Sequence, residues 1–259
     1  RLMLLAIDSG NTNIVFAVFD DAGKISGEWR ASADSNRTAD EFGIWLEQLM
    51  QLQSLARNDI DCAIIANVVP MTLFALKTLC RKYFGCEPLV VGEINVDLGI
   101  KALVDRPEDV GADRLVNAIA AHQEYGGPLI IVDFGTATTF DVVDVDGNYI
   151  GGVIAPGVNL SLEALHMAAA QLPRIAVERP QQVIGKATVP AMQSGIYWGY
   201  VSLIEGIVER IRIEFGSELR VIATGGLATL FVEATEIIET SDQDLTLRGL
   251  LAIQRRNVT

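Results

Sequence analysis

The stretch LLAIDSGNTNIVFAVFD, residues 4–20, holds two apolar runs on either side of a polar insert, DSGNTN, at 8–13. The β-branched and aromatic residues of both runs, and the absence of proline, predict strands over 4–7 and 14–19. Residues 20–23, DDAG, predict a tight turn, after which an alternating pattern returns as a third strand. The polar insert is therefore predicted to form the bend between two strands of a hairpin.

A second stretch, LIIVDFGTATTFDVVDVDG at 129–147, has the same order of features. Each copy has an apolar strand ending in Asp-x-Gly, a Thr-containing loop, a second strand and an acidic turn with glycine. Asp133 follows Asp8 by 125 residues in a chain of 259, so the repeat has the size of a domain and not of a short-period solenoid. The sequence therefore predicts an α/β fold of two duplicated domains, residues 1–126 and 127–259, each a mixed sheet with flanking helices.

The rest of the chain shows alternating helical and strand patterns. Residues 38–41, TADE, have the spacing of a capping box, and apolar residues then recur at helical intervals as far as Leu55. The apolar run 62–69, followed by Pro70, predicts a strand buried on both faces. Further helices are expected over 71–84, 109–125, 160–172, 189–215 and at the end of the chain, and further strands over 88–92 and 220–224.

Composition excludes several classes of function. The formal net charge is −13, and without a basic stripe the chain is not expected to bind nucleic acid. No apolar run approaches the ~18 residues of a membrane span, so no membrane partner is expected. The three cysteines form no CxxC pair, which favours reduced, metal-free thiols in a cytoplasmic protein.

The two polar bends suggest phosphate binding. A strand that ends and turns back exposes consecutive backbone N–H groups, and we expect Gly10 to supply unusual φ values and a close approach to phosphate. Asp8 would repel phosphate and is expected to hold Mg²⁺, through water. The second bend offers a matching set of residues, Gly135, Thr136, Thr138 and Thr139. Facing each other across a cleft, the bends would grip a polyphosphate from both sides; the alternative is that both are ordinary polar hairpin bends.

Two further segments are candidates for a site. Gly111-Ala112-Asp113-Arg114 lies in the first turn of a predicted helix, whose free N–H groups favour an anion. Arg114 could bind a substrate carboxylate and Asp113 could act as a base toward a hydroxyl, or the two could be surface charges with Asp113 as a cap. The segment ATGG at 223–226 suits an adenosine wall or an ordinary strand-to-helix turn. Walker and Rossmann glycine motifs are absent.

The chain resembles the type III pantothenate kinases, a family of the acetate and sugar kinase, Hsp70 and actin superfamily. The resemblance covers nearly the whole chain and rests on motifs in the family's order. These are AIDSGNTN (6–13), VGADR (110–114), VDFGTATT (132–139), GGVIAPG (151–157), SLEAL (161–165), GKATVPAMQSGIYWGY (185–200), VIATGG (221–226) and DLTLRGL (244–250). It implies two actin-like, ribonuclease H-like domains with a cleft between them.

The resemblance also implies a reaction and its residues. The reaction is the ATP-dependent phosphorylation of pantothenate to 4′-phosphopantothenate, the first step of coenzyme A biosynthesis, by a homodimer. ATP would be held by Asp8, Ser9, Gly10, Asn11, Thr12, Asn13, Ile14, Val15 and Thr136. A monovalent cation, K⁺ or NH₄⁺, would bind at Asp133. Pantothenate would contact Gly111, Ala112, Asp113, Arg114 and Thr188, with Asp113 as proton acceptor.

The chain departs from the family's pattern at two positions. Many members have a tyrosine where Val104 stands, and valine is common where Ser9 stands.

Some members of the family are described as accessory factors for transcription, so the alternative reading is a non-catalytic nucleotide-binding accessory or regulatory protein. A phosphohydrolase or another sugar-type kinase on the same scaffold is a third possibility. The presence of Asp113 together with both polar bends favours the kinase.

Overall fold

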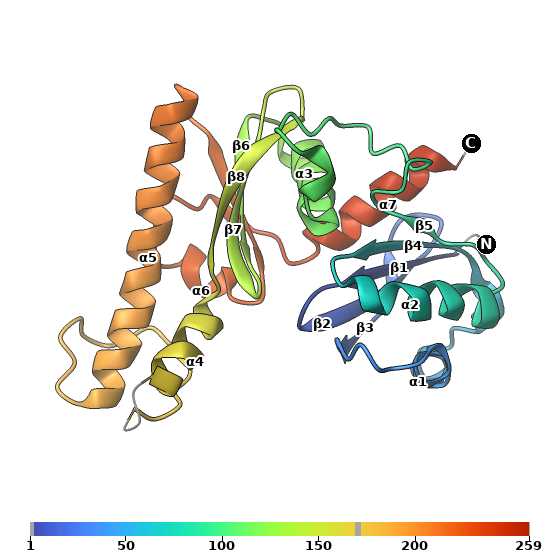
Figure 1. The fold of residues 1–259 in the computed structure, drawn as a ribbon, viewed down its shortest axis with the longest axis horizontal. Helices are drawn as coiled ribbons and strands as arrows, with labels where there is room; N and C mark the ends of the chain where they lie inside the picture. Colours follow the sequence, from blue (N-terminus) through green and yellow to red (C-terminus); the bar gives the residue numbers. More distant parts are fainter. Residues whose placement is uncertain (1–2, 169–171, 259) are drawn as a thin grey trace. The chain divides into compact units, whose positions relative to one another are not determined.

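The computed structural model describes residues 3–168 and 172–258, and the described chain divides into two compact units (Figure 1). Unit 1 contains the residues up to Gln123 and those from Asp244 onward, and unit 2 contains Glu124–Gln243. The first division lies three residues before the predicted boundary at 126. The last helix belongs to unit 1, whereas the sequence pattern assigned it to the second domain.

Unit 1 contains a five-stranded mixed sheet in the order β3-β2-β1-β4-β5. Its strands are β1 (Met3–Ser9), β2 (Asn13–Phe19), β3 (Ile25–Ser32), β4 (Ile60–Asn67) and β5 (Leu89–Val90). The first three strands are antiparallel neighbours, while β4 is parallel to β1 and β5 is parallel to β4. The polar insert at 8–13 therefore lies at the end of a central strand, as predicted.

Unit 2 repeats this topology with the order β10-β9-β6-β7-β8. Its strands are β6 (Leu129–Phe134), β7 (Ala137–Val143), β8 (Tyr149–Pro156), β9 (Arg220–Gly225) and β10 (Thr240–Ser241). The strands β6, β7 and β8 correspond to β1, β2 and β3, and β9 and β10 correspond to β4 and β5, with the same directions of pairing. The duplicated α/β fold is confirmed.

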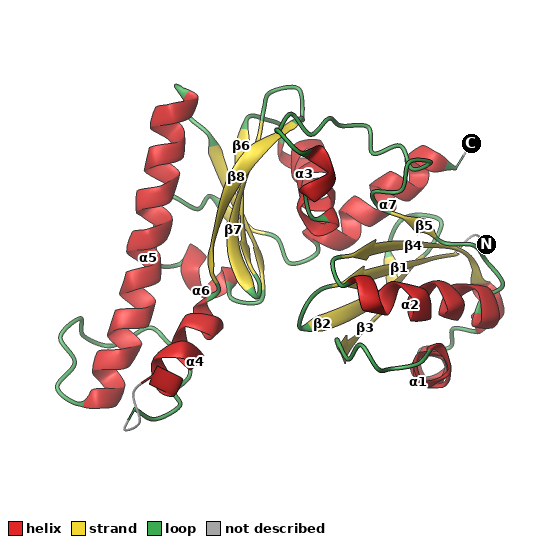
Figure 2. Cartoon of the chain, viewed as in Figure 1, coloured by secondary structure: helices red, strands yellow, loops and turns green. Residues whose placement is uncertain are grey.

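Helices cover both faces of the sheet in unit 1 (Figure 2). On one face, α1 (Ala39–Leu52) and α2 (Pro70–Tyr83) bury apolar side chains against Ile7 and Phe16. Thr38 and Glu41 form the predicted capping box of α1. The other face packs against α3 (Ala112–Tyr125) and α7 (Leu245–Asn257). Short 3₁₀ turns, Arg57–Asp59 and Pro107–Asp109, precede β4 and α3.

Unit 2 has three helices in its described part: α4 (Val158–Ala168), α5 (Thr188–Phe215) and α6 (Ala228–Val232). The predicted helix over 160–172 is therefore shorter at its end: Leu172 is not helical, and 169–171 lie outside the described residues. The α5 and α6 side chains pack on one face of the sheet, where the rings of Phe134 and Phe231 stack 4.9 Å apart.

The structure agrees with the expectation that the cysteines are unpaired thiols. Cys62, Cys80 and Cys86 are free thiols, with Cys80 fully buried and the other two partly buried. In residues 3–168 and 172–258, none of the helices combines the length and the apolar character that crossing a membrane requires.

Candidate active site

Asp8 lies near the end of β1, on the face of the sheet that α3 and α7 cover. Alternation along the strand places it with Leu4 and Ala6, whose side chains belong to that core. Across the sheet, Asp8 is opposite Val15 on β2, and Ala66 is its partner on β4. The side chain is half-buried. The carboxyl group of Asp8 is thus held by a rigid central strand at the edge where the polar bend begins.

The polar bend after Asp8 is short and closed by a backbone hydrogen bond from Gly10 N to Asn13 O, 3.0 Å. Asn11, Thr12 and Asn13 are exposed, so their side chains and the amides of the bend are accessible to a ligand. Gly10 does not have a positive φ, and the predicted unusual conformation was wrong. A Cβ at this position would instead lie 3.3 Å from the carbonyl oxygen of Asn13, so the absence of a side chain allows the bend to close tightly.

Ser9 is fully buried and points to the opposite face from Asp8. Its hydroxyl lies 3.1 Å from the hydroxyl of Thr72, which donates to Asn67 Oδ1 at 2.9 Å. This chain of hydrogen bonds connects the end of β1 to the end of β4 and the first turn of α2. Ser9 is therefore an anchor of the bend, and its side chain is not available to a nucleotide.

Asp113 lies in the first turn of α3, where the segment 111–114 was expected to be a site. Its Oδ1 accepts a hydrogen bond from the backbone N–H of Arg114 at 2.8 Å. A Cβ on Gly111 would lie 2.7 Å from the same oxygen and 3.8 Å from Cγ1 of Val68. Gly111 therefore leaves room for the carboxylate close to the end of β4, the strand beside β1.

The charge of Asp113 acts on the carboxyl group of Asp8. The pKa of Asp8 is raised to about 7, mainly by burial and secondly by the charge of Asp113, while the charge of Arg30 partly offsets the increase. Burial also raises the pKa of Asp113, although the N–H and the guanidinium of Arg114 oppose this shift. Two carboxylates that share a partly desolvated region are suited to hold a divalent cation or to accept a proton.

Arg30 is a residue of this region that the sequence patterns missed. It lies on β3 opposite Val15, which lies opposite Asp8, so the three residues form a row on one face of the sheet. Neighbouring strands are about 4.8 Å apart, which puts the backbones of Asp8 and Arg30 about 10 Å from each other. Counting the register across the β2–β3 hairpin would have revealed this positive charge.

The second bend is one residue shorter than the first, with a hydrogen bond from Gly135 N to Ala137 O, 3.0 Å. Thr136 is exposed at its tip. Thr138, expected in the same cradle, is instead fully buried on the face that packs against α5, since it lies opposite Phe134. Thr139 points to the other face, because successive residues of a strand alternate.

Asp133 lies on β6 at the position that corresponds to Asp8. It is half-buried and opposite Thr139 on β7 and Thr224 on β9. Gly225 has a φ of 90°, and a Cβ there would lie 2.6 Å from Asp133 Oδ1, so only glycine fits beside this carboxylate. The described residues contain no cluster of three or more His, Cys, Asp or Glu side chains able to hold a metal.

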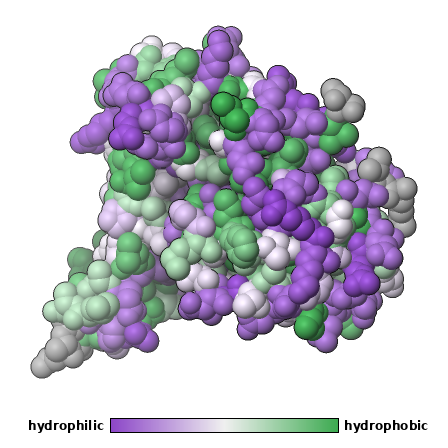
Figure 3. Space-filling model, turned by 45° about the vertical axis from the view of Figure 1, so that its right-hand side comes forward, coloured by the Kyte–Doolittle hydropathy of each residue, from purple (hydrophilic) through white to green (hydrophobic). Residues whose placement is uncertain are grey.

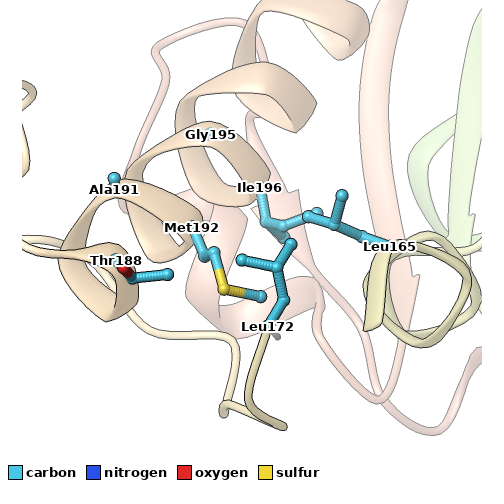
Figure 4. A pocket seen from close by; sticks show the side chains of 7 residues that line it. All are labelled: Leu165, Leu172, Thr188, Ala191, Met192, Gly195 and Ile196. Atoms are coloured by element: carbon cyan, nitrogen blue, oxygen red, sulfur yellow. The ribbon is translucent and has the colours of Figure 1, made fainter. Parts of the chain in front are cut away.

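Thr188 is the first residue of α5 and is exposed. It lines an open pocket of about 610 Å³ between α4 and α5, together with Leu165, Leu172, Ala191, Met192, Gly195 and Ile196. Figure 4 shows the side chains of Leu165, Leu172, Met192 and Ile196 converging in this pocket. The pocket is apolar apart from Thr188, whose hydroxyl is the one side-chain polar group among these residues.

The chain is similar to known proteins along its length. A family model described as type III pantothenate kinase matches residues 4–210. A protein named type III pantothenate kinase from Paramagnetospirillum magneticum is 71% identical over 257 residues, which cover 99% of this chain and 98% of that protein. A protein of the same name from Rhodospirillum rubrum is 69% identical over 255 residues, which cover 98% and 99%.

Solved structures with low sequence identity share the fold. The activator of 2-hydroxyisocaproyl-CoA dehydratase from Clostridium difficile, solved with bound ADPNP, superposes with a TM-score of 0.56 at 14% identity, covering 98% of this chain and 95% of that one. At this identity the likeness shows the fold alone, and it agrees with the two duplicated sheets described above.

Proposed function

The chain belongs to the type III pantothenate kinase family, and we propose that Asp113 and the bend after Asp8 carry its reaction. The protein is an ATP-using kinase that phosphorylates pantothenate in coenzyme A biosynthesis. The observation that carries the proposed roles is that the charge of Asp113, at the start of α3, acts on the carboxyl group of Asp8 near the end of β1.

Asp113 is proposed as the proton acceptor. The hydroxyl oxygen of pantothenate attacks the γ-phosphorus of ATP, the bond from that phosphorus to the β–γ bridging oxygen breaks, and ADP leaves. The proton of the hydroxyl passes to the Asp113 carboxylate, whose position at the start of α3 is fixed by the Arg114 N–H. Positioning and charge neutralisation account for most of the rate in phosphoryl transfer.

The bend 8–15 is proposed to hold the phosphates of ATP. Asn11, Thr12 and Asn13 present exposed polar groups there, and Thr136 on the second bend adds a hydroxyl. Gly10, Ile14 and Val15 shape the bend, and Ser9 fixes it from the buried side. Asp8 fits a hydrated Mg²⁺, since a half-buried carboxylate with a raised pKa gains from a nearby cation. When bound, Mg²⁺ neutralises charge on the β- and γ-phosphates.

A monovalent cation, K⁺ or NH₄⁺, is proposed at Asp133. The close approach of Gly225 leaves Asp133 Oδ1 in a cradle that a side chain would fill. A cation here would supply positive charge to a site whose phosphate bends contain no lysine.

Pantothenate is proposed to contact Gly111–Arg114 and Thr188. Arg114 offers a planar, charged group that suits the carboxylate of pantothenate. We place the reaction in the cytoplasm, a proposal that the three free thiols support.

A homodimer is proposed on the basis of exposed apolar side chains in and near α4 and α5. Leu160, Met167, Val183 and Ile184 are 53%, 77%, 65% and 79% exposed. Figure 3 shows hydrophobic side chains on the surface at its lower left, over this part of unit 2. Sedimentation equilibrium tests this proposal: Ile184→Asp should yield monomers, and a wild-type chain that sediments as a monomer contradicts it.

The kinase roles are tested by mass spectrometry of 4′-phosphopantothenate after incubation with ATP, Mg²⁺, K⁺ and pantothenate. Asp113→Asn should lower kcat by ~10²-fold or more with little change in the melting temperature. Asp109→Asn, which changes an exposed carboxylate four residues earlier, is the control. Near-normal turnover of Asp113→Asn would show that another group accepts the proton.

A further inference from the structure

We infer that Thr139 supplies a neutral oxygen to the cation proposed at Asp133, and that Asp141 is the residue that positions it. This inference rests on the proposed function, since it adds a second ligand to the proposed cation site. It is drawn from a hydrogen-bond network on β7 and β8 that no sequence motif indicated.

Asp133 and Thr139 are neighbours on one face of the sheet of unit 2. They are directly opposite in the antiparallel pair of β6 and β7, an arrangement that holds Cβ atoms about 4.5–5.5 Å apart. Their strand neighbours Phe134 and Phe140 point to the other face, into the core with α5. The side chain of Thr139 is therefore beside that of Asp133 and away from that core.

Asp141 determines the direction of the Thr139 hydroxyl. Thr139 Oγ1 donates to Asp141 Oδ2 at 3.0 Å, and the hydroxyl of Tyr149 donates to Asp141 Oδ1, also at 3.0 Å. Asp141 is 0% exposed and Tyr149 is 2% exposed. With one hydroxyl on each oxygen, the carboxylate cannot rotate without losing a buried hydrogen bond, so the network is rigid.

The proton of Thr139 is thus directed away from Asp133. A hydroxyl has one proton and two lone pairs, so a threonine that donates to Asp141 presents only acceptor lone pairs in its remaining directions. Asp133 as a carboxylate also presents only acceptors. A cation within reach of both oxygens would offset the repulsion between them. K⁺ and NH₄⁺ both satisfy this arrangement, the first by coordination and the second by donation.

The chain offers a matched control one residue away. Thr138 has the same side chain on the same strand, but it lies on the opposite face, and its buried hydroxyl has no hydrogen-bond partner in the described residues. Replacing Thr138 with valine changes the same atoms as replacing Thr139, without touching the Asp133 face.

The experiment compares thermal unfolding of the nucleotide-free protein in KCl and in choline chloride, together with the K⁺ concentration that gives half-maximal kinase activity. The wild-type chain should be stabilised by K⁺. In Thr139→Val this stabilisation should disappear, whereas Thr139→Ser and Thr138→Val should retain it. Asp141→Asn should raise the half-maximal K⁺ concentration by ~10–100-fold, the usual effect of losing a residue that orients a metal ligand, with kcat largely recovered at saturating K⁺.

The outcomes distinguish failure of the cation site at Asp133 from failure of the role of Thr139 alone. A wild-type chain that is equally stable in KCl and in choline chloride overturns the cation site at Asp133, and the role of Thr139 with it. A K⁺-stabilised wild-type chain whose Thr139→Val variant is stabilised equally overturns only the role of Thr139. Equal loss of K⁺ stabilisation in Thr138→Val would assign the effect to packing in β7 and also reject the inference.

Discussion

Asp8 and Asp113 come from segments about a hundred residues apart, yet the charge of Asp113 adds to burial in raising the pKa of Asp8 to about 7. The two carboxyl groups lie on the face of the sheet that α3 covers, one on a strand and one on a helix. Burial raises the pKa of both carboxyl groups above that of an exposed aspartate. These raised pKa values can be measured without substrate.

Replacing Asp8 with asparagine should stabilise the nucleotide-free protein at neutral and higher pH. Because the folded-state pKa is raised above the unfolded value, wild-type stability is lost as pH rises from about 4 through about 7. The advantage of Asp8→Asn in the free energy of unfolding should therefore grow by ~2–3 kcal/mol between about pH 5 and about pH 8. Urea unfolding measures this, with Asp21→Asn in the exposed turn as control. An advantage independent of pH would contradict the raised pKa of Asp8.

The pH dependence of catalysis should reflect both carboxyl groups. Burial raises the pKa of Asp113, and a protonated carboxyl cannot accept the proton of the substrate, so kcat/KM should fall on acidification at a higher pH than an exposed aspartate would cause. Added Mg²⁺ should recover only the part of the loss that arises at Asp8. Rate profiles at low and high Mg²⁺ test this, and a flat profile from about pH 8 to about pH 5 would be inconsistent with it.

Gly225→Ala should damage the proposed cation site, while Gly226→Ala should not. A methyl group on Gly225 would meet Asp133 Oδ1 at 2.6 Å in a backbone conformation with φ 90°, whereas Gly226 has open space around it. We expect Gly225→Ala to lose ~1–3 kcal/mol of stability, the cost of backbone strain of this kind, and to need more K⁺ for activity. Chemical unfolding and K⁺ titration provide the measurements. Equal behaviour of the two variants would show that Asp133 tolerates displacement.

Arg30→Gln should weaken ATP binding without changing the fold. Arg30 shares a row with Asp8 and Val15, and its own salt bridge to Glu28 is long, 3.9 Å, and exposed. Loss of this charge should raise KM for ATP by ~3–10-fold, more at low ionic strength, since an exposed charge is screened by salt. Lys24→Gln, which removes an exposed charge just before β3, is the control. An unchanged KM would exclude Arg30 from the phosphate region.

The sequence predicted the elements of the fold well because their signals are local. Strand periodicity and the capping box at Thr38 depend on residues close together in the chain. The repeat of Asp8 at Asp133 joins distant positions, but each copy is recognised from its own short stretch of sequence. The one-residue difference between the two bends also appears in the sequence, where Asp8 precedes Gly23 by 15 positions and Asp133 precedes Gly147 by 14. These features specify two similar sheets, and pairing then follows from the hairpin turns.

The features that were missed depend on register and on distant contacts. Thr138 and Thr139 lie on opposite faces of the sheet, and which of them shares a face with Asp133 depends on the register of β7. The position of Arg30 relative to Asp8 depends on pairing across β2 and β3. The apolar side of α7 did not reveal which sheet it would cover. Gly10 shows that glycine in a bend can serve close packing and not a positive φ. None of these can be decided from side-chain type alone.

The return of α7 to the first sheet has a consequence for the order in which the protein can mature. Leu247, Leu250 and Ile253 pack against Leu4, Ala6 and Ile64, which precede them in the chain by about 180 to 250 residues. Unit 2 is thus an insertion within unit 1. It can be fully synthesised while unit 1 still lacks α7. A nascent chain released before residue 244 would have α3 but not α7 on this face of the sheet, and its partly exposed apolar residues would be open to chaperones and to aggregation.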